Sequence, residues 1–193
     1  MKTRIFTVVL LFSFIFYSCN NEKKQNSVKS EAKQEQKVVE THGQAGVAAV
    51  EGEQQNALQV AKSIEDFSTL VTAIDAAGVQ DAVVNAGPLT ILAPLNSAFA
   101  KLPEGTVETL VKPENKSKLA FILVNHVAPA NYPIKQLKKE AKKGRKLYMA
   151  SGKYLVVEDK DGEIFVEGSK ILKSVKVSNG WIHVIDDVLV PAE

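Results

Sequence analysis

Few side chains in this 193-residue sequence have the types and spacing that catalysis or metal binding requires. The sequence contains neither a Gly-x-Ser-x-Gly turn nor a glycine-rich phosphate loop, the signatures of α/β hydrolases and nucleotide-binding proteins. His126 and His183 each lack a second histidine at metal-ligand spacing. We therefore predict no catalytic residues, no metal site, no cofactor and no enzymatic activity.

Asp186 and Asp187 are adjacent carboxylates close to His183. A separation of three residues places His183 and Asp186 on opposite faces of a strand, so they are not expected to act as a pair. Two interpretations of the acidic pair stay open: a small acidic patch, or the solvated end of a strand.

The single cysteine, Cys19, follows a segment that predicts a use for it. Two basic residues precede an apolar run over 5–17, which is too short to cross a bilayer and matches the core of a signal peptide. The run ends in Phe-Tyr-Ser-Cys, which resembles a bacterial lipoprotein signal, although Tyr17 is bulkier than that signal prefers. The alternative is an ordinary signal peptide with an incidental cysteine.

We expect residues 1–18 to be a cleaved lipoprotein signal peptide and Cys19 to carry the lipid. Several acyl chains on one residue give a stable membrane anchor. This predicts an exported, membrane-anchored bacterial lipoprotein on the periplasmic or outer-surface side. Because the anchor uses the single cysteine, no disulfide is expected.

The residues after Cys19 divide into two parts by composition. Residues 19–59 have no aromatic and few large aliphatic side chains, so they cannot bury enough apolar surface to fold and predict a flexible polar tether. Residues 60–193 carry periodic apolar patterns and predict one globular domain. The formal net charge of +2 gives no overall preference for a polyanion.

Helical patterns come first in the domain and strand patterns second, which predicts an α+β fold. Ser63 is expected to cap the first helix and Asn96 a later one. Helices are expected over 64–77, 79–85, 97–102, 106–111, 114–124 and 134–143. Strands are expected over 89–93, 146–149, 153–158, 163–167 and 181–190, with a hairpin turn at Asp161-Gly162.

A basic cluster stands out on the surface that these elements predict. Its members are Lys135, Lys138, Lys139, Lys142, Lys143, Arg145 and Lys146. It is either a binding site for an acidic polysaccharide, an anionic lipid or nucleic acid, or the solvated face of a helix that turns Ile134 and Leu137 inward. No aromatic residues are interleaved with it, so nucleic acid is not an expected partner.

Four aromatic residues lie in the strand-rich half: Tyr148, Tyr154, Phe165 and Trp181. They could line a sugar site, or they could be core and sheet-face residues.

Three segments in order are similar to the conserved blocks of one family, the fasciclin-type adhesion domain. They are Gly87–Phe99, Ile122–Val127 and Asn179–Pro191. The resemblance covers roughly residues 60–191. It implies a wedge-shaped β-sandwich of about seven strands with several α-helices. It also implies structural roles for the residues that match the blocks, namely Asn96, Phe99, His126, Asn179, Gly180 and His183.

The resemblance implies a non-catalytic adhesion or binding module that engages a polysaccharide, matrix or protein partner. The alternative is an envelope carrier of a small hydrophobic compound or porphyrin. Family members linked to integrin binding have Tyr where this chain has Asn125, and Asp-Ile where it has Ser174-Val175. Integrin binding is therefore not expected.

Overall fold

The computed structural model describes residues 54–191. The predicted signal peptide, the lipid on Cys19 and most of the predicted tether lie outside the described residues. The helical elements are α1 (Ala57–Lys62), η2 (Glu65–Phe67), α2 (Ser68–Ala77), α3 (Gln80–Val84), α4 (Asn96–Phe99), α5 (Thr106–Leu110), η3 (Pro113–Asn115), α6 (Lys116–Val124) and α7 (Ile134–Lys142). The strands are β1 (Leu89–Pro94), β2 (Val127–Ala128), β3 (Lys146–Tyr148), β4 (Tyr154–Lys160), β5 (Glu163–Val166), β6 (Ser169–Val177) and β7 (Gly180–Ile185).

The strands form one seven-stranded sheet in the order β2-β1-β7-β6-β5-β4-β3. The pair β1–β7 is parallel and every other pair is antiparallel. β4 and β5 are joined by the expected hairpin turn, in which Asp161 and Gly162 have positive φ angles, as two-residue hairpin turns require. The α+β class with about seven strands and several helices is therefore confirmed.

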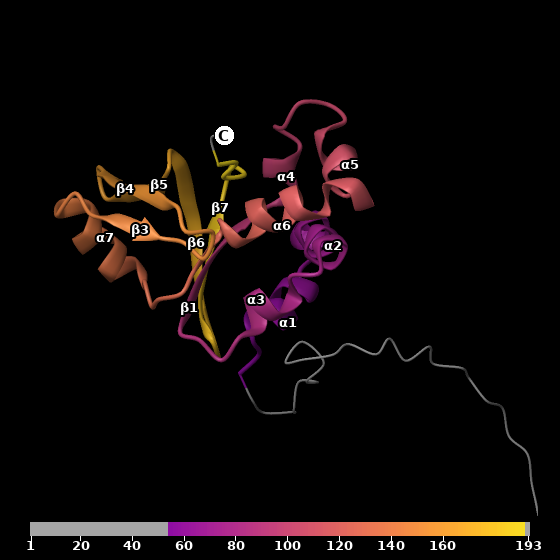
Figure 1. The fold of residues 1–193 in the computed structure, drawn as a ribbon. Coiled ribbons are helices and arrows are strands. Elements are labelled where there is room, and N and C mark those ends of the chain that lie inside the picture. The colour runs from indigo at the N-terminus through magenta and orange to yellow at the C-terminus, as the bar shows by residue number, and fades with distance from the viewer. Residues whose placement is uncertain (1–53, 192–193) are drawn as a thin grey trace, which may run out of the picture. The chain divides into compact units, whose positions relative to one another are not determined.

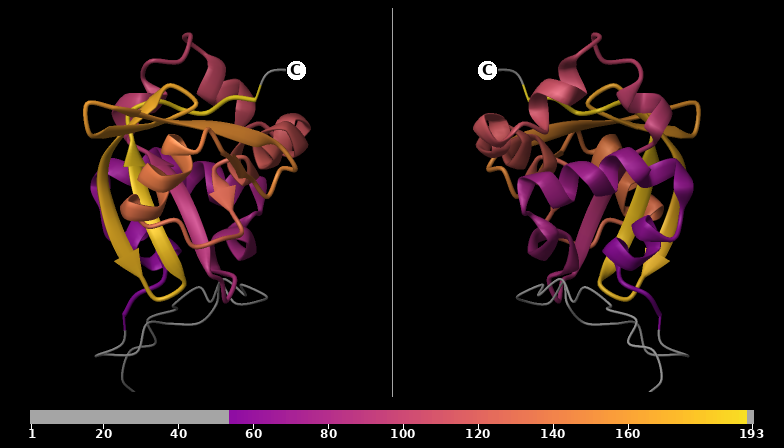
Figure 2. Two further views of the ribbon diagram at one scale, coloured as in Figure 1. Left: turned by 90° about the vertical axis from the view of Figure 1, so that its left-hand side faces the viewer. Right: turned by 90° about the vertical axis from the view of Figure 1, so that its right-hand side faces the viewer.

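The core lies on both faces of β1 and β7. Figure 1 shows α1, α2, α3 and α6 on one side of these strands, and β3–β5 with α7 on the other. Ile91 and Ile182 pack into the helical side, whereas Leu92 and Ile185 belong to the cluster under α7. The right-hand view of Figure 2 shows the first helices of the domain, in purple, in front of β1 and β7. Because both faces are covered, β1 reads as a continuous apolar run, as buried parallel strands do.

The folded part begins earlier than the expected residue 60. α1 starts at Ala57 and is capped by Asn56, whose side chain accepts a hydrogen bond from Gln59 N while the Gln59 side chain accepts one from Asn56 N. Ala57 and Leu58 are buried in the core. The expected cap at Ser63 is wrong, because Ser63 ends α1 instead of starting a helix.

The structure has two strands that the sequence patterns did not predict, and one predicted strand is shorter than expected. β2 and β6 were not among the expected strands, and β7 ends at Ile185 instead of residue 190. In the part of the chain that the structure describes, no helix has both the length and the apolar character needed to cross a membrane.

Candidate functional site

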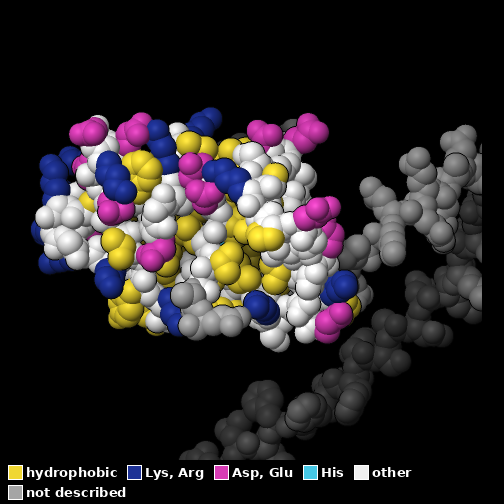
Figure 3. Space-filling model, turned by 90° about the horizontal axis from the view of Figure 1, so that it is seen from above, with side chains coloured by type: hydrophobic (Ala, Val, Ile, Leu, Met, Phe, Trp, Pro, Cys, Tyr) yellow, Lys and Arg dark blue, Asp and Glu magenta, His cyan; other side chains and the backbone are white. Residues whose placement is uncertain are grey.

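The basic cluster lies on α7 and on the turn into β3. α7 is amphipathic: Leu137 is 0% exposed and packs under the sheet, with Ile134 and Ala141 partly buried beside it. The opposite face carries the lysines, of which Lys138 is half-buried and the others are exposed. Figure 3 shows Lys and Arg side chains along the edge of the domain that carries α7 and β3–β5, at the left of the view.

One carboxylate lies under the cluster. Glu140 is buried; it accepts a hydrogen bond from Gln136 and lies 3.8 Å from Arg145 Nη1. Among the described residues, no carboxylate lies within ion-pair distance of the cluster's lysines. The lysine charges are thus available to an anionic partner, while Arg145 is engaged by the protein itself.

The four aromatic residues do not form one site. Tyr148 and Tyr154 are opposite each other on β3 and β4 with ring centroids 5.3 Å apart. Phe165 instead lies under Lys160, whose Nζ is 4.8 Å from the ring centroid. Trp181 is half-buried and lies nearly parallel to the His183 ring at 6.4 Å.

His126 is a buried link between α6 and the C-terminal segment. Its Nδ1 lies 2.8 Å from the Ile122 carbonyl, which can only accept, so Nδ1 carries the proton. Its Nε2 accepts a hydrogen bond from Leu189 N at 2.9 Å. Burial lowers the pKa of His126 to about 4, and the hydrogen bond to Ile122 opposes this shift. His126 is therefore neutral near pH 7 and has no free ring nitrogen.

His183 is a second buried link, between β7 and its neighbours. Its Nε2 donates to the Tyr132 carbonyl at 2.7 Å, so Nδ1 accepts from the Ser174 hydroxyl, also at 2.7 Å. Burial lowers the pKa of His183, and the hydrogen bond to Tyr132 opposes this. Both ring nitrogens are occupied within the protein, which fits a structural role for His183.

Asn179 and Gly180 join the start of β7 to three other elements. Asn179 Oδ1 accepts a hydrogen bond from Ala57 N at 3.0 Å, and its Nδ2 donates to the Val83 carbonyl at 2.9 Å. Gly180 lies opposite Leu89 of β1 with φ +145°, and a Cβ atom there would lie 1.8 Å from the Leu89 carbonyl oxygen. Both residues hold the β1–β7 pair in place.

Asn96 links two helical segments. Its expected role as the cap of its own helix is wrong, since α4 has no side-chain cap. Instead, Asn96 Oδ1 accepts a hydrogen bond from Thr69 N at 2.9 Å, and its Nδ2 donates to Ser68 Oγ. Phe99 is half-buried and packs against the helical core cluster.

Asn125, which stands where the resemblance implies a tyrosine in integrin-linked family members, lies in the interior. It is 1% exposed and accepts a hydrogen bond from Ser151 Oγ at 2.7 Å. Its Nδ2 donates to the Leu189 carbonyl. The side chain is thus engaged within the protein and is not presented to a partner.

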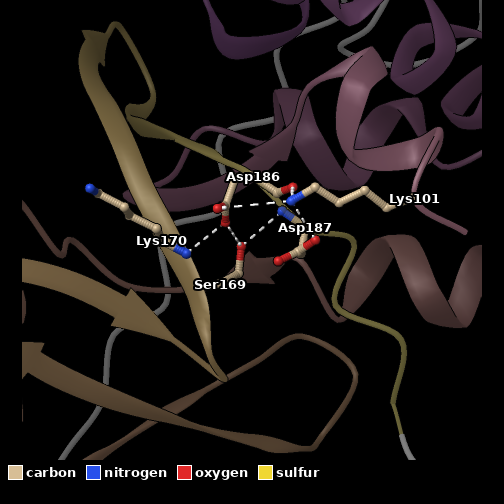
Figure 4. Close-up of polar contacts among 5 residues, drawn as sticks. All are labelled: Lys101, Ser169, Lys170, Asp186 and Asp187. Carbon is tan, nitrogen blue, oxygen red and sulfur yellow. Dashed lines mark hydrogen bonds and ion pairs between the residues drawn. The ribbon is translucent and has the colours of Figure 1, made fainter.

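The acidic pair of Asp186 and Asp187 is held by contacts with Lys101, Ser169 and Lys170 (Figure 4). Asp186 Oδ1 accepts hydrogen bonds from Ser169 Oγ and from Lys170 N. Lys101 Nζ donates to the Asp186 carbonyl at 2.7 Å and lies 2.9 Å from Asp187 Oδ1. The hydrogen bond to Asp187 raises the pKa of Lys101. No sequence spacing could have revealed this contact, because Lys101 is 85 residues from Asp186. The pair is therefore an internal contact that joins the end of β7 to β6 and to the turn after α4.

An apolar cavity lies beside His126, between α4, α5, α6 and the C-terminal segment. Its lining includes Phe99, Leu110 and Ile122, and its volume is about 20 Å³. A small-ligand carrier needs a pocket of roughly 300–1,000 Å³. This cavity has room for about one water molecule, so it is too small to hold the ligand of such a carrier.

The described residues contain neither a candidate metal site nor an unpaired buried polar side chain. Within 54–191, no group of three or more His, Cys, Asp or Glu side chains could hold a metal ion. No buried side-chain nitrogen or oxygen in this range lacks a hydrogen-bond partner. The polar groups of the interior are thus used by the fold, and the groups available to a partner are on the surface.

The sequence and the fold are both similar to those of known proteins. Residues 65–191 match the model of a family described as Fasciclin domain. The protein sll1483 of Synechocystis sp. is 42% identical over 135 residues, which cover 69% of this chain and 72% of that protein. Two animal proteins also match: transforming growth factor-beta-induced protein ig-h3 of Sus scrofa is 32% identical over 139 residues, and human periostin is 27% identical over 144 residues.

The similarity to the animal proteins is confined to a part of each. It covers 70% and 69% of this chain but 20% of ig-h3 and 16% of periostin. Among solved structures, a FAS1 domain pair from the insect cell adhesion molecule fasciclin I superposes with a TM-score of 0.64 at 21% identity. That match covers 72% of this chain and 52% of the insect chain, and it establishes the fold.

Proposed function

We propose that this chain, which belongs to the fasciclin domain family, is a lipid-tethered, non-catalytic binding module of the bacterial cell envelope. Fasciclin domains are generally adhesion or matrix-interacting modules without catalytic activity. The finer part of the proposal is that this domain is exported, is held at a membrane through Cys19, and engages a polysaccharide, matrix or protein partner.

The observation that carries the proposal is the exposed lysine face of α7. Its charges have no carboxylate partners among the described residues, and the helix beneath them is fixed to the core by Leu137. A rigid helix that presents several unpaired cations attracts a negatively charged surface and raises the association rate. Integrin binding is not part of the proposal, because Asn125 and Ser174 replace the residues linked to it.

Replacing Cys19 with serine should release the protein from the membrane. Each acyl CH₂ group buried in the bilayer contributes about 0.8 kcal/mol, so the loss of the lipid removes the main attraction to the membrane. Fractionation of expressing cells should move the protein from the membrane fraction to the soluble exported fraction, and Asn21→Ser serves as the neighbouring control. An unmodified Cys19 in the mass spectrum of the wild-type mature protein would overturn the anchor.

Neutralising the exposed lysines of α7 should weaken binding to the envelope or matrix material that the protein engages. With three surface contacts of about 0.5 kcal/mol each, Lys139→Gln, Lys142→Gln and Lys143→Gln together should raise the Kd roughly tenfold at low salt. High salt should reduce this difference, because it screens exposed charges.

The matched control removes the same charge from the helical half of the domain. Lys62, Lys112 and Lys116 are exposed and lie outside the basic cluster, so their replacement by glutamine should change the Kd less than twofold. Pull-down on cell-surface material at two salt concentrations measures both variants. Equal losses in the two triple variants would contradict a role for α7.

A further inference from the structure

The outer face of the β3–β4 hairpin carries two exposed tyrosines. Tyr148 is 48% exposed and Tyr154 is 62% exposed, although large aromatic rings usually gain stability from burial. Their neighbours along the two strands, Leu147 and Leu155, point into the core and fix the hairpin. The tyrosines are thus held on a rigid surface with their rings open to solvent.

The two tyrosine rings are in contact across the strand pair, which restricts the orientation of each. They belong to directly opposite residues, their centroids are 5.3 Å apart and their planes are inclined by 56°. Neither hydroxyl group has a hydrogen-bond partner among the described residues. Two apolar ring surfaces with free hydroxyl groups at their tips suit a sugar, which presents C–H groups on its faces and hydroxyl groups around its edge.

One member of the basic cluster shares the outer face of the hairpin with the tyrosine pair. Lys146 precedes Tyr148 by two residues on β3, so both side chains are on the same face of the strand. Lys146 is paired with the exposed Val156 of β4. Lys142 and Lys143 are also exposed and come three to four residues before Lys146 in the chain, at the end of α7, which packs on the inner face of the hairpin through Leu137. They therefore lie toward the β3 edge of the sheet, next to the face that carries the tyrosines. We call these five residues the tyrosine–lysine strip: Tyr148, Tyr154, Lys146, Lys142 and Lys143.

A carboxylate next to the tyrosine–lysine strip opposes the binding of a polyanion. Glu167 is placed beside β4, where its Oε2 accepts a hydrogen bond from Val156 N at 2.8 Å. A polyanion on the strip would be attracted by the lysines and repelled by this carboxylate. Glu167 therefore gives a variant that should strengthen binding instead of weakening it.

We infer that the tyrosine–lysine strip binds an acidic polysaccharide, with sugar rings against Tyr148 and Tyr154 and acidic groups beside Lys146, Lys142 and Lys143. The inference rests on the proposed function and names the chemical class of its partner. Charge complementarity favours a polymer with regularly spaced carboxylates, and the exposed rings favour a sugar over a polyanion that lacks one. Cross-strand tyrosine pairs also stabilise hairpins, but this role alone predicts no effect on binding.

The test compares three polymers on the full mature protein: alginate, which is a sugar with carboxylates, dextran, which is a neutral sugar, and poly-glutamate, which is a polyanion without sugar rings. Alginate should bind most tightly. Tyr148→Leu with Tyr154→Leu should raise the Kd for alginate about tenfold, equivalent to two aromatic contacts, and change that for poly-glutamate less than twofold. Tyr148→Phe with Tyr154→Phe keeps both rings and should stay within about threefold of wild type.

Variants of charged residues separate the electrostatic contribution to binding from the contribution of the tyrosine rings. Lys142→Gln with Lys146→Gln should weaken alginate and poly-glutamate alike, whereas Glu167→Gln should strengthen both about twofold. Phe121→Leu replaces another exposed aromatic residue, on α6, and should change nothing; thermal unfolding confirms that each variant is folded. Equal alginate affinity in the double leucine variant and wild type overturns the inference. A second outcome separates this inference from the proposed function. If wild type does not bind alginate, but the triple variant of Lys139, Lys142 and Lys143 binds cell-surface material more weakly than wild type, this inference fails and the proposed function stands.

Discussion

Replacing Gly180 with alanine should prevent the domain from folding. The new Cβ would lie 1.8 Å from the Leu89 carbonyl oxygen and 2.8 Å from its carbonyl carbon, and real non-bonded contacts of this kind are more than 3 Å. The clash is with backbone, so no side-chain rotation relieves it. β1 cannot move away, because both of its faces are packed into the core. We expect a loss of at least about 4 kcal/mol in the free energy of unfolding, or no folded protein at all.

Gly152→Ala is the matched control for this prediction. Gly152 also has a positive φ, of +80°, but a Cβ there would meet nothing within 4 Å. Its replacement should cost only the backbone strain, about 1–2 kcal/mol. Urea unfolding followed by circular dichroism measures both variants. A Gly180→Ala protein that loses no more stability than Gly152→Ala would show that β1 and β7 do not approach this closely.

The elements that the sequence predicts well are those in which the local pattern and the tertiary position agree. β1 was expected because a strand buried on both faces is apolar throughout, and α7 because its apolar positions recur at helical spacing. The hairpin turn at Asp161-Gly162 was expected because few sequences other than Asp-Gly and Asn-Gly tolerate two positive φ angles. These features are fixed by residues close together in the chain.

β6 shows where the local pattern stops being informative. Its residues carry several lysines, and the burial pattern has no clean alternation because a register shift occurs between Ile171 and Lys173. Its strand conformation comes from pairing with β7 on one side and β5 on the other. The start of the domain shows the same dependence on distant residues, since α1 is held by Asn179 through Ala57 N.

The candidate site also has features that the local sequence predicts and features that depend on the completed fold. The amphipathic pattern of α7 predicted which face its lysines would occupy, and the placement of Leu137 agrees with that expectation. The pairing of Tyr148 with Tyr154 needs the register of β3 and β4, which a sequence does not fix when the connecting loop is five residues long. Asn96 was expected to cap its own helix, but its side chain reaches α2, 27 residues earlier in the chain. Side-chain partners at such separations depend on the completed fold.

Acidification should weaken the domain well before its carboxylates are protonated. Above about pH 6.5, His126 is neutral in both the folded and the unfolded chain, so it adds no pH dependence. Below pH 6.5 the unfolded chain binds a proton, but the folded chain does not until its pKa of about 4. The free energy of unfolding should therefore fall by about 1.4 kcal/mol per pH unit between these two values, to a total of about 3 kcal/mol. His183, whose pKa is also lowered by burial, should steepen the fall.

Urea titrations between pH 7 and pH 5 test this prediction, because Asp and Glu stay mostly ionised in that range. His126→Gln should be less stable than wild type at pH 7, since it disturbs the contacts to Ile122 and Leu189. It should nevertheless lose less stability on acidification, because one of the two titrating groups is gone. NMR titration of the His126 ring adds a direct measurement: a midpoint above pH 6 would show that the ring is not enclosed by α6 and the C-terminal segment. The pH slope thus reports on the same buried contacts that leave His126 unavailable for catalysis or metal binding.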